Sequence, residues 1–532
     1  MRRAGGRVLY GPRFNNYFSF RRAWLVYWEV MKARIPGVSE RIARVLASRI
    51  FWYAVFVLFI LQAVWLACSA AYPMAFDEQY HFGLIQLHAH QWLPFLTSQP
   101  PTGLYGAAVR DPSYLYHWLM SLPYRGISLF THDQTIQIIL LRLLNVALFA
   151  YALVLYRRLL RRLGLSAALT NVALLAFTLI PVVPFLAATI NYDNLLIVVV
   201  PWSILLTLDV MASFNKGRVP LARLVVLASV LLLGGLVKYP FLPVLVVVGL
   251  FLLWQAWRQK LFTARIWRTA WRSVRARAPW QQALLVLLLV VSLGLFAERY
   301  GVNVARYHTP VPKCNRVVSQ DLCLEYGPWA RDYALVAEKA SSFRPNLITY
   351  TGSWLYGMWY RLFFAIGPQP TYDTKPPLFI VGRMSIGVAV LMALGIALRW
   401  RRLFTGHPER VLLLLIMLGY GLALFASDYS SYVHTAQVVA INGRYWIPFL
   451  LFFFALGGFA WMDILKRVPG VKVGTAAVVL AVLLLQGGGA MSYIIRSNDS
   501  WYWPNATVRR VNDDIRGAVS PLIFGKDLPH PS

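Results

Sequence analysis

The chain has 532 residues, with 52 Lys and Arg against 21 Asp and Glu, and carries a formal net charge of +31. Apolar residues make up 58% and charged residues 14% of the chain. This leaves too little polar surface for several soluble domains and too much aromatic and aliphatic side chain for disorder. The composition excludes both classes and predicts an all-α polytopic membrane protein.

Apolar runs of about 20 residues, the length of a helix that crosses a bilayer, recur along the chain. We expect about eleven transmembrane helices, over residues 51–72, 136–156, 165–188, 193–213, 220–238, 240–257, 281–297, 378–398, 410–427, 445–462 and 471–491. The stretch 113–131 is apolar but contains Pro123 and Arg125. It is therefore expected to form an interfacial helix in the first outer loop.

The basic residues are concentrated in alternate loops, which orients the chain. Residues 1–50 hold eleven Lys and Arg, and residues 258–277 hold seven. Because cytoplasmic loops carry the basic excess, both segments are expected inside. We interpret the charge as topological and expect no nucleic-acid partner. The protein is expected to be a multi-pass protein of the cell membrane, inner or plasma, with its N-terminus in the cytoplasm.

Three regions follow from this topology. A basic cytoplasmic segment covers residues 1–50, a membrane module covers 51–491, and an extracytoplasmic tail covers 492–532. The module has outer loops at 73–135 and 298–376, and the second loop contains Cys314 and Cys323. An oxidising compartment makes a disulfide between them the expected state, with two free thiols as the alternative.

Polar groups from five separate segments converge on the predicted outer face. They are Asp77-Glu78 after the first span, Asn191 and Asp193 between spans three and four, Lys238 between spans five and six, Asp428 at the end of span nine, and Arg444-Tyr445 at the start of span ten. Ionisable groups at a membrane interface are costly and often functional, so this convergence predicts a cleft.

These residue types indicate a particular chemistry. Of two adjacent carboxylates, one can serve as a general base when its surroundings raise its pKa. Lys238 and Arg444 are cations at the edge of an apolar wall, where the phosphate of a membrane lipid would lie. Such cations neutralise a phosphate leaving group as its bond breaks.

The ordered motifs resemble the GT-C superfamily of membrane glycosyltransferases, which use polyprenyl-phosphate sugars. The nearest groups are protein O-mannosyltransferases, lipid A aminoarabinose transferases and an uncharacterised bacterial branch. An Asp-Glu-x-x-His-Phe signature is matched at residues 77–82, an Asn-x-Asp turn at 191–193 and a Gly-Arg-Tyr-x-x-Pro stretch at 443–448. The resemblance covers roughly residues 50–465.

The resemblance implies a GT-C-like bundle and a reaction on the extracytoplasmic face, with inversion at the anomeric carbon as the expected stereochemistry. Sugar would move from a polyprenyl-phosphate donor to an envelope glycan, lipid or protein. Asp77 would be the general base, with Glu78 as the other catalytic carboxylate. Donor and acceptor contacts would come from His81, Asn191, Asp193, Lys238, Arg444 and Tyr445.

Other functions remain open at this point. A transporter or flippase of lipid-linked sugars would place charges near the bilayer midplane, whereas the spans here are almost free of charge. A polymerase or ligase of such sugars, or a non-catalytic assembly subunit, would share the outer cleft. We expect no cofactor, and a divalent metal is the alternative that the histidines of the first outer loop leave open.

Overall fold

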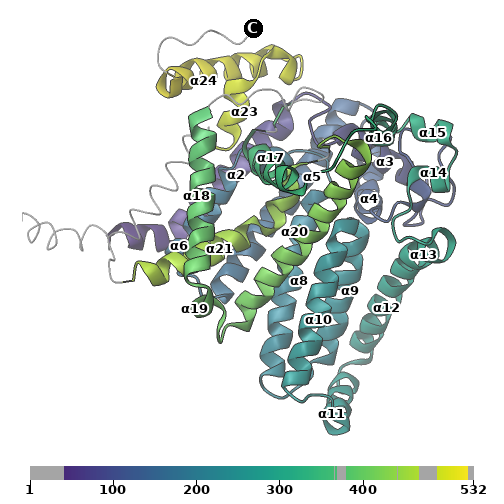
Figure 1. The fold of residues 1–532 in the computed structure, drawn as a ribbon, viewed down its shortest axis with the longest axis vertical. Helices are drawn as coiled ribbons and strands as arrows, with labels where there is room; N and C mark the ends of the chain where they lie inside the picture. Colours follow the sequence, from purple (N-terminus) through teal and green to yellow (C-terminus); the bar gives the residue numbers. More distant parts are fainter. Residues whose placement is uncertain (1–40, 365, 368–378, 440, 467–487, 525–532) are drawn as a thin grey trace, which may run out of the picture.

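The computed structural model describes residues 41–364, 366–367, 379–439, 441–466 and 488–524. Regular structure in these ranges is helical apart from isolated bridge residues, which include an antiparallel bridge between Ala70 and Tyr502. Long helices run side by side through the molecule, and shorter helices gather at one end of them (Figure 1). The protein is therefore all-α. The predicted basic segment up to residue 40 and most of the predicted last span, 471–487, lie outside the described residues.

The first half of the chain builds most of the long bundle. Its elements are α2 (Arg49–Ser69), α3 (Glu78–Ala89), η1 (Ala108–Arg110), α4 (Leu115–Phe130), α5 (Gln134–Arg162), α6 (Ala167–Thr178), α7 (Val182–Ala187), α8 (Asp193–Phe214), α9 (Leu221–Val237), η2 (Tyr239–Phe241), α10 (Leu242–Arg258) and α11 (Ala264–Arg275).

The second half adds further long helices and several short ones. Its elements are α12 (Pro279–Phe296), a π-helical turn (Ala297–Gly301), α13 (Val302–Tyr307), α14 (Cys314–Val317), α15 (Gln320–Leu324), α16 (Gly327–Ala337), α17 (Leu347–Phe364), α18 (Phe379–Leu398), α19 (Trp400–Phe404), α20 (Pro408–Thr435), η5 (Gly443–Trp446), α21 (Ile447–Ile464), α23 (Ala490–Arg496), η6 (Asp499–Trp501) and α24 (Ala506–Phe524).

Seven helices of the described chain are long and apolar enough to cross a membrane. They span Arg49–Ser69, Gln134–Arg162, Asp193–Phe214, Tyr239–Arg258, Pro279–Tyr307, Pro408–Thr435 and Gly443–Ile464. Three further predicted spans correspond to the shorter apolar helices Ala167–Thr178, Leu221–Val237 and Ser385–Leu398. The protein is thus membrane-embedded, with seven candidate spans among the described residues. The expected total of about eleven transmembrane helices stays a prediction.

Polar caps fix where the long helices begin. The Ser48 side chain accepts a hydrogen bond from the Phe51 amide at the start of α2. The Asp133 carboxylate accepts from the amides of Thr135 and Ile136 at the start of α5. Such caps satisfy amides that the first helical turn leaves free. They give each apolar run a defined first residue.

The predicted span at 165–188 is not one helix, which corrects the sequence interpretation. It is divided into α6 and α7. Pro181, which has no amide hydrogen and cannot donate to the helical ladder, lies at the break and caps the start of α7. The Leu179 carbonyl instead accepts a hydrogen bond from the Gly489 amide at 2.7 Å. The break therefore serves as the docking point of the chain that leads into α23.

Two predicted span ends also differ from the structure. The helix predicted to end at 297 continues through the π-helical turn to Tyr307. The helix predicted to end at 427 continues to Thr435, so Asp428 lies inside α20. Charged residues at 298 and 428 led to the shorter assignments. A helix can continue past a charge when that charge has a partner, as Glu298 has in Arg110 at 3.0 Å.

The second outer loop is attached to the first at a close contact. Cys314 and Cys323 are joined in a disulfide, which ties α14 to α15. The Glu325 carboxylate accepts a hydrogen bond from the Gly103 amide at 2.7 Å. A Cβ atom at Gly103 would lie 1.8 Å from the Leu322 carbonyl oxygen, so only glycine fits there. The two loops predicted to be on the outer side, 73–135 and 298–376, are therefore in direct contact.

Candidate functional site

Two acidic and two basic side chains meet at one end of the bundle. Lys238 Nζ lies 2.5 Å from Asp193 Oδ1, and Arg444 Nη2 lies 3.1 Å from Asp77 Oδ2. Arg444 Nε is 3.8 Å from the other oxygen of Asp193. The side chains of Lys238, Asp193 and Arg444 are at most 5% exposed, whereas that of Asp77 is 50% exposed. Asp77 is thus the member of the cluster that reaches solvent.

Backbone geometry aims Asp77 into this cluster. Phe76 and Asp77 both lie in the left-handed region, with φ values of 70° and 63°. This conformation is unfavourable for residues other than glycine and persists only where the surroundings hold it. The Asn191 amide donates to the Phe76 carbonyl at 2.8 Å, and its oxygen accepts from the Asp193 amide at 2.9 Å. Asn191 therefore connects the Asp77 turn to the start of α8.

Lys238 is placed by the break between two helices. It ends α9 in an extended conformation, and η2 begins at the next residue. Its ammonium group lies over the rings of Tyr192 and Tyr445, 4.5 Å and 4.3 Å from their centroids. Aromatic faces stabilise a buried cation. Tyr445 thus contributes a wall to the site, next to Lys238.

Arg444 is placed by the tight turn η5. The Asn442 side chain accepts from the Arg444 amide at 3.1 Å. A Cβ atom at Gly443 would lie 2.2 Å from the Met358 carbonyl oxygen of α17. Glycine is therefore required for η5 to pack against α17. This packing determines where the adjacent Arg444 lies.

The cluster retains unused hydrogen-bonding capacity. Among the described residues, the Nε and Nη1 atoms of Arg444 and the Oδ2 atom of Asp193 are buried without a hydrogen-bond partner. Buried polar atoms in this condition are uncommon and call for an explanation. Two nitrogen donors and one carboxylate acceptor lie within the same few ångströms. Together they can bind a ligand that has both an anionic oxygen and a hydroxyl group.

Glu78 has a different role from its neighbour Asp77. Its carboxylate is fully buried and receives Arg142 through two nitrogens, at 2.8 Å and 2.7 Å. It also accepts from the amides of Met74 and Ile190 at 2.7 Å and 3.1 Å. No lone pair remains for proton transfer. These contacts favour a positioning role for Glu78, and its share in catalysis with Asp77 stays a prediction.

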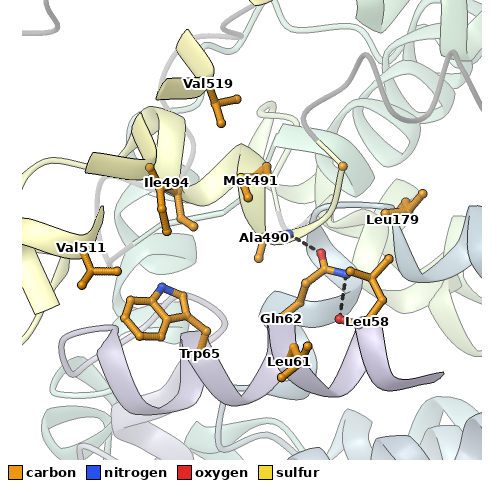
Figure 2. Close-up of a pocket in the computed structure, with 12 residues that line it drawn as sticks. Leu58, Leu61, Gln62, Trp65, Leu179, Ala490, Met491, Ile494, Val511 and Val519 are labelled. Carbon is orange, nitrogen blue, oxygen red and sulfur yellow. Dashed lines mark hydrogen bonds between the residues drawn. The ribbon is translucent and has the colours of Figure 1, made fainter. Parts of the chain in front are cut away.

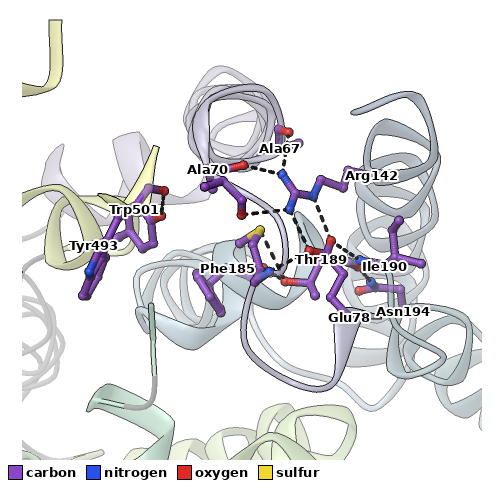
Figure 3. Close-up of polar contacts among 12 residues, drawn as sticks. Ala67, Ala70, Glu78, Arg142, Phe185, Thr189, Ile190, Asn194, Tyr493 and Trp501 are labelled. Carbon is purple, nitrogen blue, oxygen red and sulfur yellow. Dashed lines mark hydrogen bonds and ion pairs between the residues drawn. The ribbon is translucent and has the colours of Figure 1, made fainter. Parts of the chain in front are cut away.

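Arg142 joins the segments that surround the site (Figure 3). Besides Glu78, it donates to the carbonyls of Ala67, Ala70 and Ala71 at the end of α2. One guanidinium from α5 thus fixes the end of α2, the start of α3 and, through Glu78, the turn at Ile190. Arg142 therefore fixes the direction in which the chain continues from α2 into the segment 73–135.

His81 pairs with another histidine. Its Nδ1 atom lies 2.9 Å from His117 Nε2, and its ring packs edge-on against Tyr192 at 4.5 Å. Burial lowers the pKa of His81 well below 6.5, and the charges of Arg444 and Lys238 lower it further. The imidazole is therefore neutral at pH 7. It supports the Tyr192 wall and is one contact removed from the charged cluster.

Asp428 does not join the cluster. Its carboxylate accepts from the Trp354 indole at 2.8 Å in a separate apolar group formed by α17 and α20. Four of the five predicted polar segments therefore meet, and the fifth stabilises the α17–α20 contact beside them.

Arg142 and His117 lie beside the candidate site, but the sequence analysis gave Arg142 no role and considered His117 only as one of the histidines that could hold a metal. Arg142 is the one basic residue within the apolar run at 136–156. A charge inside a predicted span requires a buried partner, and this signal was available in the sequence. His117 had no comparable signal, because its pairing with His81 depends on how α3 and α4 pack.

A pocket of about 450 Å³ lies elsewhere, between α2 and the C-terminal helices α23 and α24 (Figure 2). Its walls are almost entirely apolar. The Gln62 amide contributes a polar group, but it is already bonded to the Leu58 carbonyl and the Ala490 amide. No ionisable side chain lines this pocket. It therefore offers space without reactive chemistry.

Neither a group of metal-binding side chains nor a similarity to a known protein identifies the function of the site. Within the described part of the chain, no three His, Cys, Asp or Glu side chains are grouped so that they could hold a metal ion. No family model matches the chain, and no curated protein and no solved structure matches it. The class that the fold defines is a membrane-embedded all-α protein with a charged cluster at one end of its bundle.

Proposed function

We propose that the protein is an integral membrane glycosyltransferase of the GT-C type, which moves a sugar from a polyprenyl-phosphate donor to a cell-envelope acceptor. The observation that carries this proposal is the half-exposed Asp77 carboxylate beside the buried cations Arg444 and Lys238. A carboxylate that reaches solvent next to two buried cations is the arrangement that such a transfer requires.

Each residue then has a defined task in the reaction. The acceptor hydroxyl attacks the anomeric carbon while its proton passes to Asp77. The bond between that carbon and the phosphate oxygen breaks, and polyprenyl phosphate leaves with the bonding electrons. The free nitrogens of Arg444 receive the phosphate charge, with Lys238 close by. The free oxygen of Asp193 accepts a hydrogen bond from the sugar.

Two further contacts support this division of roles. The guanidinium carbon of Arg444 lies 4.9 Å from the ring centroid of Phe76 and 5.3 Å from that of Tyr445. These rings enclose the Arg444 side chain. Low local polarity strengthens the attraction between a guanidinium and a phosphate. The long chain of the donor would lie in the bilayer beside the helices.

The test is transfer from a panel of radiolabelled polyprenyl-phosphate sugars, measured in membranes with wild-type protein and with Asp77→Asn. Wild type should release polyprenyl phosphate from at least one donor. The variant should lose this turnover while retaining donor binding, because the amide fits the same space but cannot accept the proton. Asp332→Asn, which changes an exposed carboxylate of the outer loop, serves as the control and should retain full activity.

Two results would contradict the proposal. Turnover by Asp77→Asn at the wild-type rate would remove Asp77 as the base. A folded wild-type protein that releases polyprenyl phosphate from no donor would point instead to transport of the lipid-linked sugar, which needs no bond cleavage.

A further inference from the structure

The helix α11 separates its side chains into an apolar stripe and an arginine stripe. Ile266, Ala270 and Val274 recur every four residues and are the less exposed positions of the helix. The four arginines, Arg265, Arg268, Arg272 and Arg275, recur at spacings of three and four residues and are all exposed. This periodicity places each set on its own face of an α-helix.

The connections of α11 hold it at the membrane surface. It follows the candidate span Tyr239–Arg258 and precedes the candidate span Pro279–Tyr307, with short links at 259–263 and 276–278. Only 6% of the most apolar stretch of the second span is buried inside the protein, so that helix faces lipid. Figure 1 shows α11 at the end of the molecule opposite α3 and α16. A helix between two such spans lies where both of them leave the bilayer.

Large aromatic side chains surround the arginine stripe. Trp271 is 56% exposed, and Trp257 and Trp280, at the adjoining ends of α10 and α12, are 71% and 66% exposed. Tryptophan at such positions favours the headgroup level of a bilayer. These positions of Trp257, Trp271 and Trp280, in α11 and at the ends of the two adjoining spans, favour contact with the bilayer over contact with a soluble partner.

The cations of this region lack acidic partners. Between Asp209 and Glu298 the sequence contains no Asp or Glu. Within the described chain, none of the seven Lys and Arg residues at 258–277 forms an ion pair. Their charge is therefore available to an external anion. The closest source of anions for a helix at this depth is the phosphate layer of the membrane.

We propose that α11 is an in-plane binding surface for anionic phospholipid headgroups, at the membrane face opposite the Asp77 cluster. The tryptophans set the depth of the helix, and Arg265, Arg268, Arg272 and Arg275 bind lipid phosphates and acidic headgroups. This proposal does not depend on glycosyl transfer. It would hold equally if the Asp77 cluster had another function.

The test uses the full-length protein in phosphatidylcholine bilayers. Electron spin resonance measures how strongly spin-labelled phosphatidylglycerol and spin-labelled phosphatidylcholine associate with it. Two triple variants are compared with wild type. The test variant combines Arg265→Gln, Arg268→Gln and Arg272→Gln. The control combines Arg158→Gln, Lys216→Gln and Arg218→Gln, which removes the same charge from exposed positions near the end of α5 and in the loop after α8.

Wild type should associate with phosphatidylglycerol several-fold more strongly than with phosphatidylcholine at low salt. The test variant should lose most of this preference, by about fivefold or more, since a surface cation near a bilayer contributes about that factor. The control should retain the preference. Added salt should weaken it in wild type, because the contacts are exposed.

A variant with unchanged charge tests whether lipid binding depends on the placement of α11 or only on the number of arginines. Trp271→Ala keeps every arginine but removes an indole that anchors the helix, and it should also lower the preference for phosphatidylglycerol. Thermal unfolding of each variant verifies that the protein is folded. An equal loss in the two triple variants, or equal association of the two lipids with wild type, would overturn the proposal.

Discussion

Asp77 and Glu78 are adjacent in the chain and carry the same functional group, but their surroundings assign them to different tasks. The Glu78 carboxylate is fully buried and receives four hydrogen bonds, two of them from Arg142. The Asp77 carboxylate is half exposed and has one bond, from Arg444. Only the second arrangement leaves an oxygen free to take a proton. Environment, and not residue type, therefore distinguishes the proposed base Asp77 from the buried Glu78.

Removal of Arg142 should destabilise the protein strongly. Arg142→Ala leaves the Glu78 charge buried without a partner, which costs about 3–5 kcal/mol of the free energy of unfolding. Combining it with Glu78→Gln should recover part of this loss, because the buried charge is then gone. Asp209→Asn breaks an exposed pair with Arg162 and should cost less than about 1 kcal/mol. Thermal unfolding in detergent measures all of them; equal effects of Arg142→Ala and Asp209→Asn would contradict the assignment.

The buried histidines should make stability depend on pH. Burial lowers the pKa of His81 and His117 well below 6.5 and that of His88 to about 4. Below pH 6.5 the unfolded chain therefore binds more protons at these positions than the folded chain. The free energy of unfolding is complete above pH 6.5 and falls as the pH drops, by up to about 1.4 kcal/mol per pH unit for each histidine.

The measurement is the unfolding midpoint between pH 7.5 and pH 5, in wild type and in two variants. His117→Gln should show a shallower dependence, because one of the groups no longer titrates. His132→Gln, at an exposed position, should keep the wild-type dependence. A midpoint that stays constant over this range would show that the histidines bind protons equally in the folded and unfolded states.

At the scale of elements, the turn η5 positions the candidate site through a single small residue. Gly443→Ala would bring a methyl group to 2.2 Å from the Met358 carbonyl oxygen and 2.7 Å from the Leu362 amide. Both neighbours are backbone atoms of α17 and cannot move aside cheaply. The turn should shift and carry Arg444 with it.

We expect Gly443→Ala to weaken donor binding by at least about tenfold, because a phosphate contact depends on ångström-scale placement of the guanidinium. Gly249→Ala is a matched control, since a Cβ atom there meets nothing within 4 Å. It should leave binding unchanged. Donor affinity of the purified proteins, measured by titration calorimetry, checks both. Wild-type affinity in Gly443→Ala would mean that Arg444 does not contact the donor.

The sequence predicted elements well where apolar periodicity was uninterrupted, as in α2, α5 and α8. It predicted poorly where tertiary contacts decide the outcome. The break after α6 depends on Pro181 and on a carbonyl that Gly489 satisfies from far along the chain. The meeting of Asp77, Asp193, Lys238 and Arg444 followed from topology alone, because all four were assigned to the same membrane face. Their pairing depends on the Asp77 turn, the break after α9 and the turn η5, and the separation of Asp428 depends on the packing of α17 against α20.

At the scale of the whole molecule, the chain should present its two ends to opposite sides of the membrane. Asp193 lies in the charged cluster, and α8 extends from it over 22 residues, about 33 Å. The loop after α8 must then face the other side. His132 precedes α5, whose Arg142 binds Glu78 beside the cluster, and should lie on the cluster side.

Labelling with a membrane-impermeant maleimide tests this sidedness, in a Cys68→Ser background that leaves the disulfide in place. His132→Cys should react in intact cells, because the cluster is expected outside. Arg218→Cys should react only after the membrane is permeabilised. The reverse pattern would invert the orientation, and equal labelling of both positions in intact cells would contradict a spanning α8.

The pair of Arg142 and Glu78 has a consequence for biosynthesis. A lone arginine disfavours partition of a helix from the translocon into lipid by about 2.5 kcal/mol when it lies near the helix centre. Residue 78 leaves the ribosome before residue 142, so the carboxylate that neutralises this arginine is already present when α5 emerges. The order of synthesis thus supplies the counter-ion ahead of the charge, and α5 can enter the bilayer as part of a preassembled hairpin.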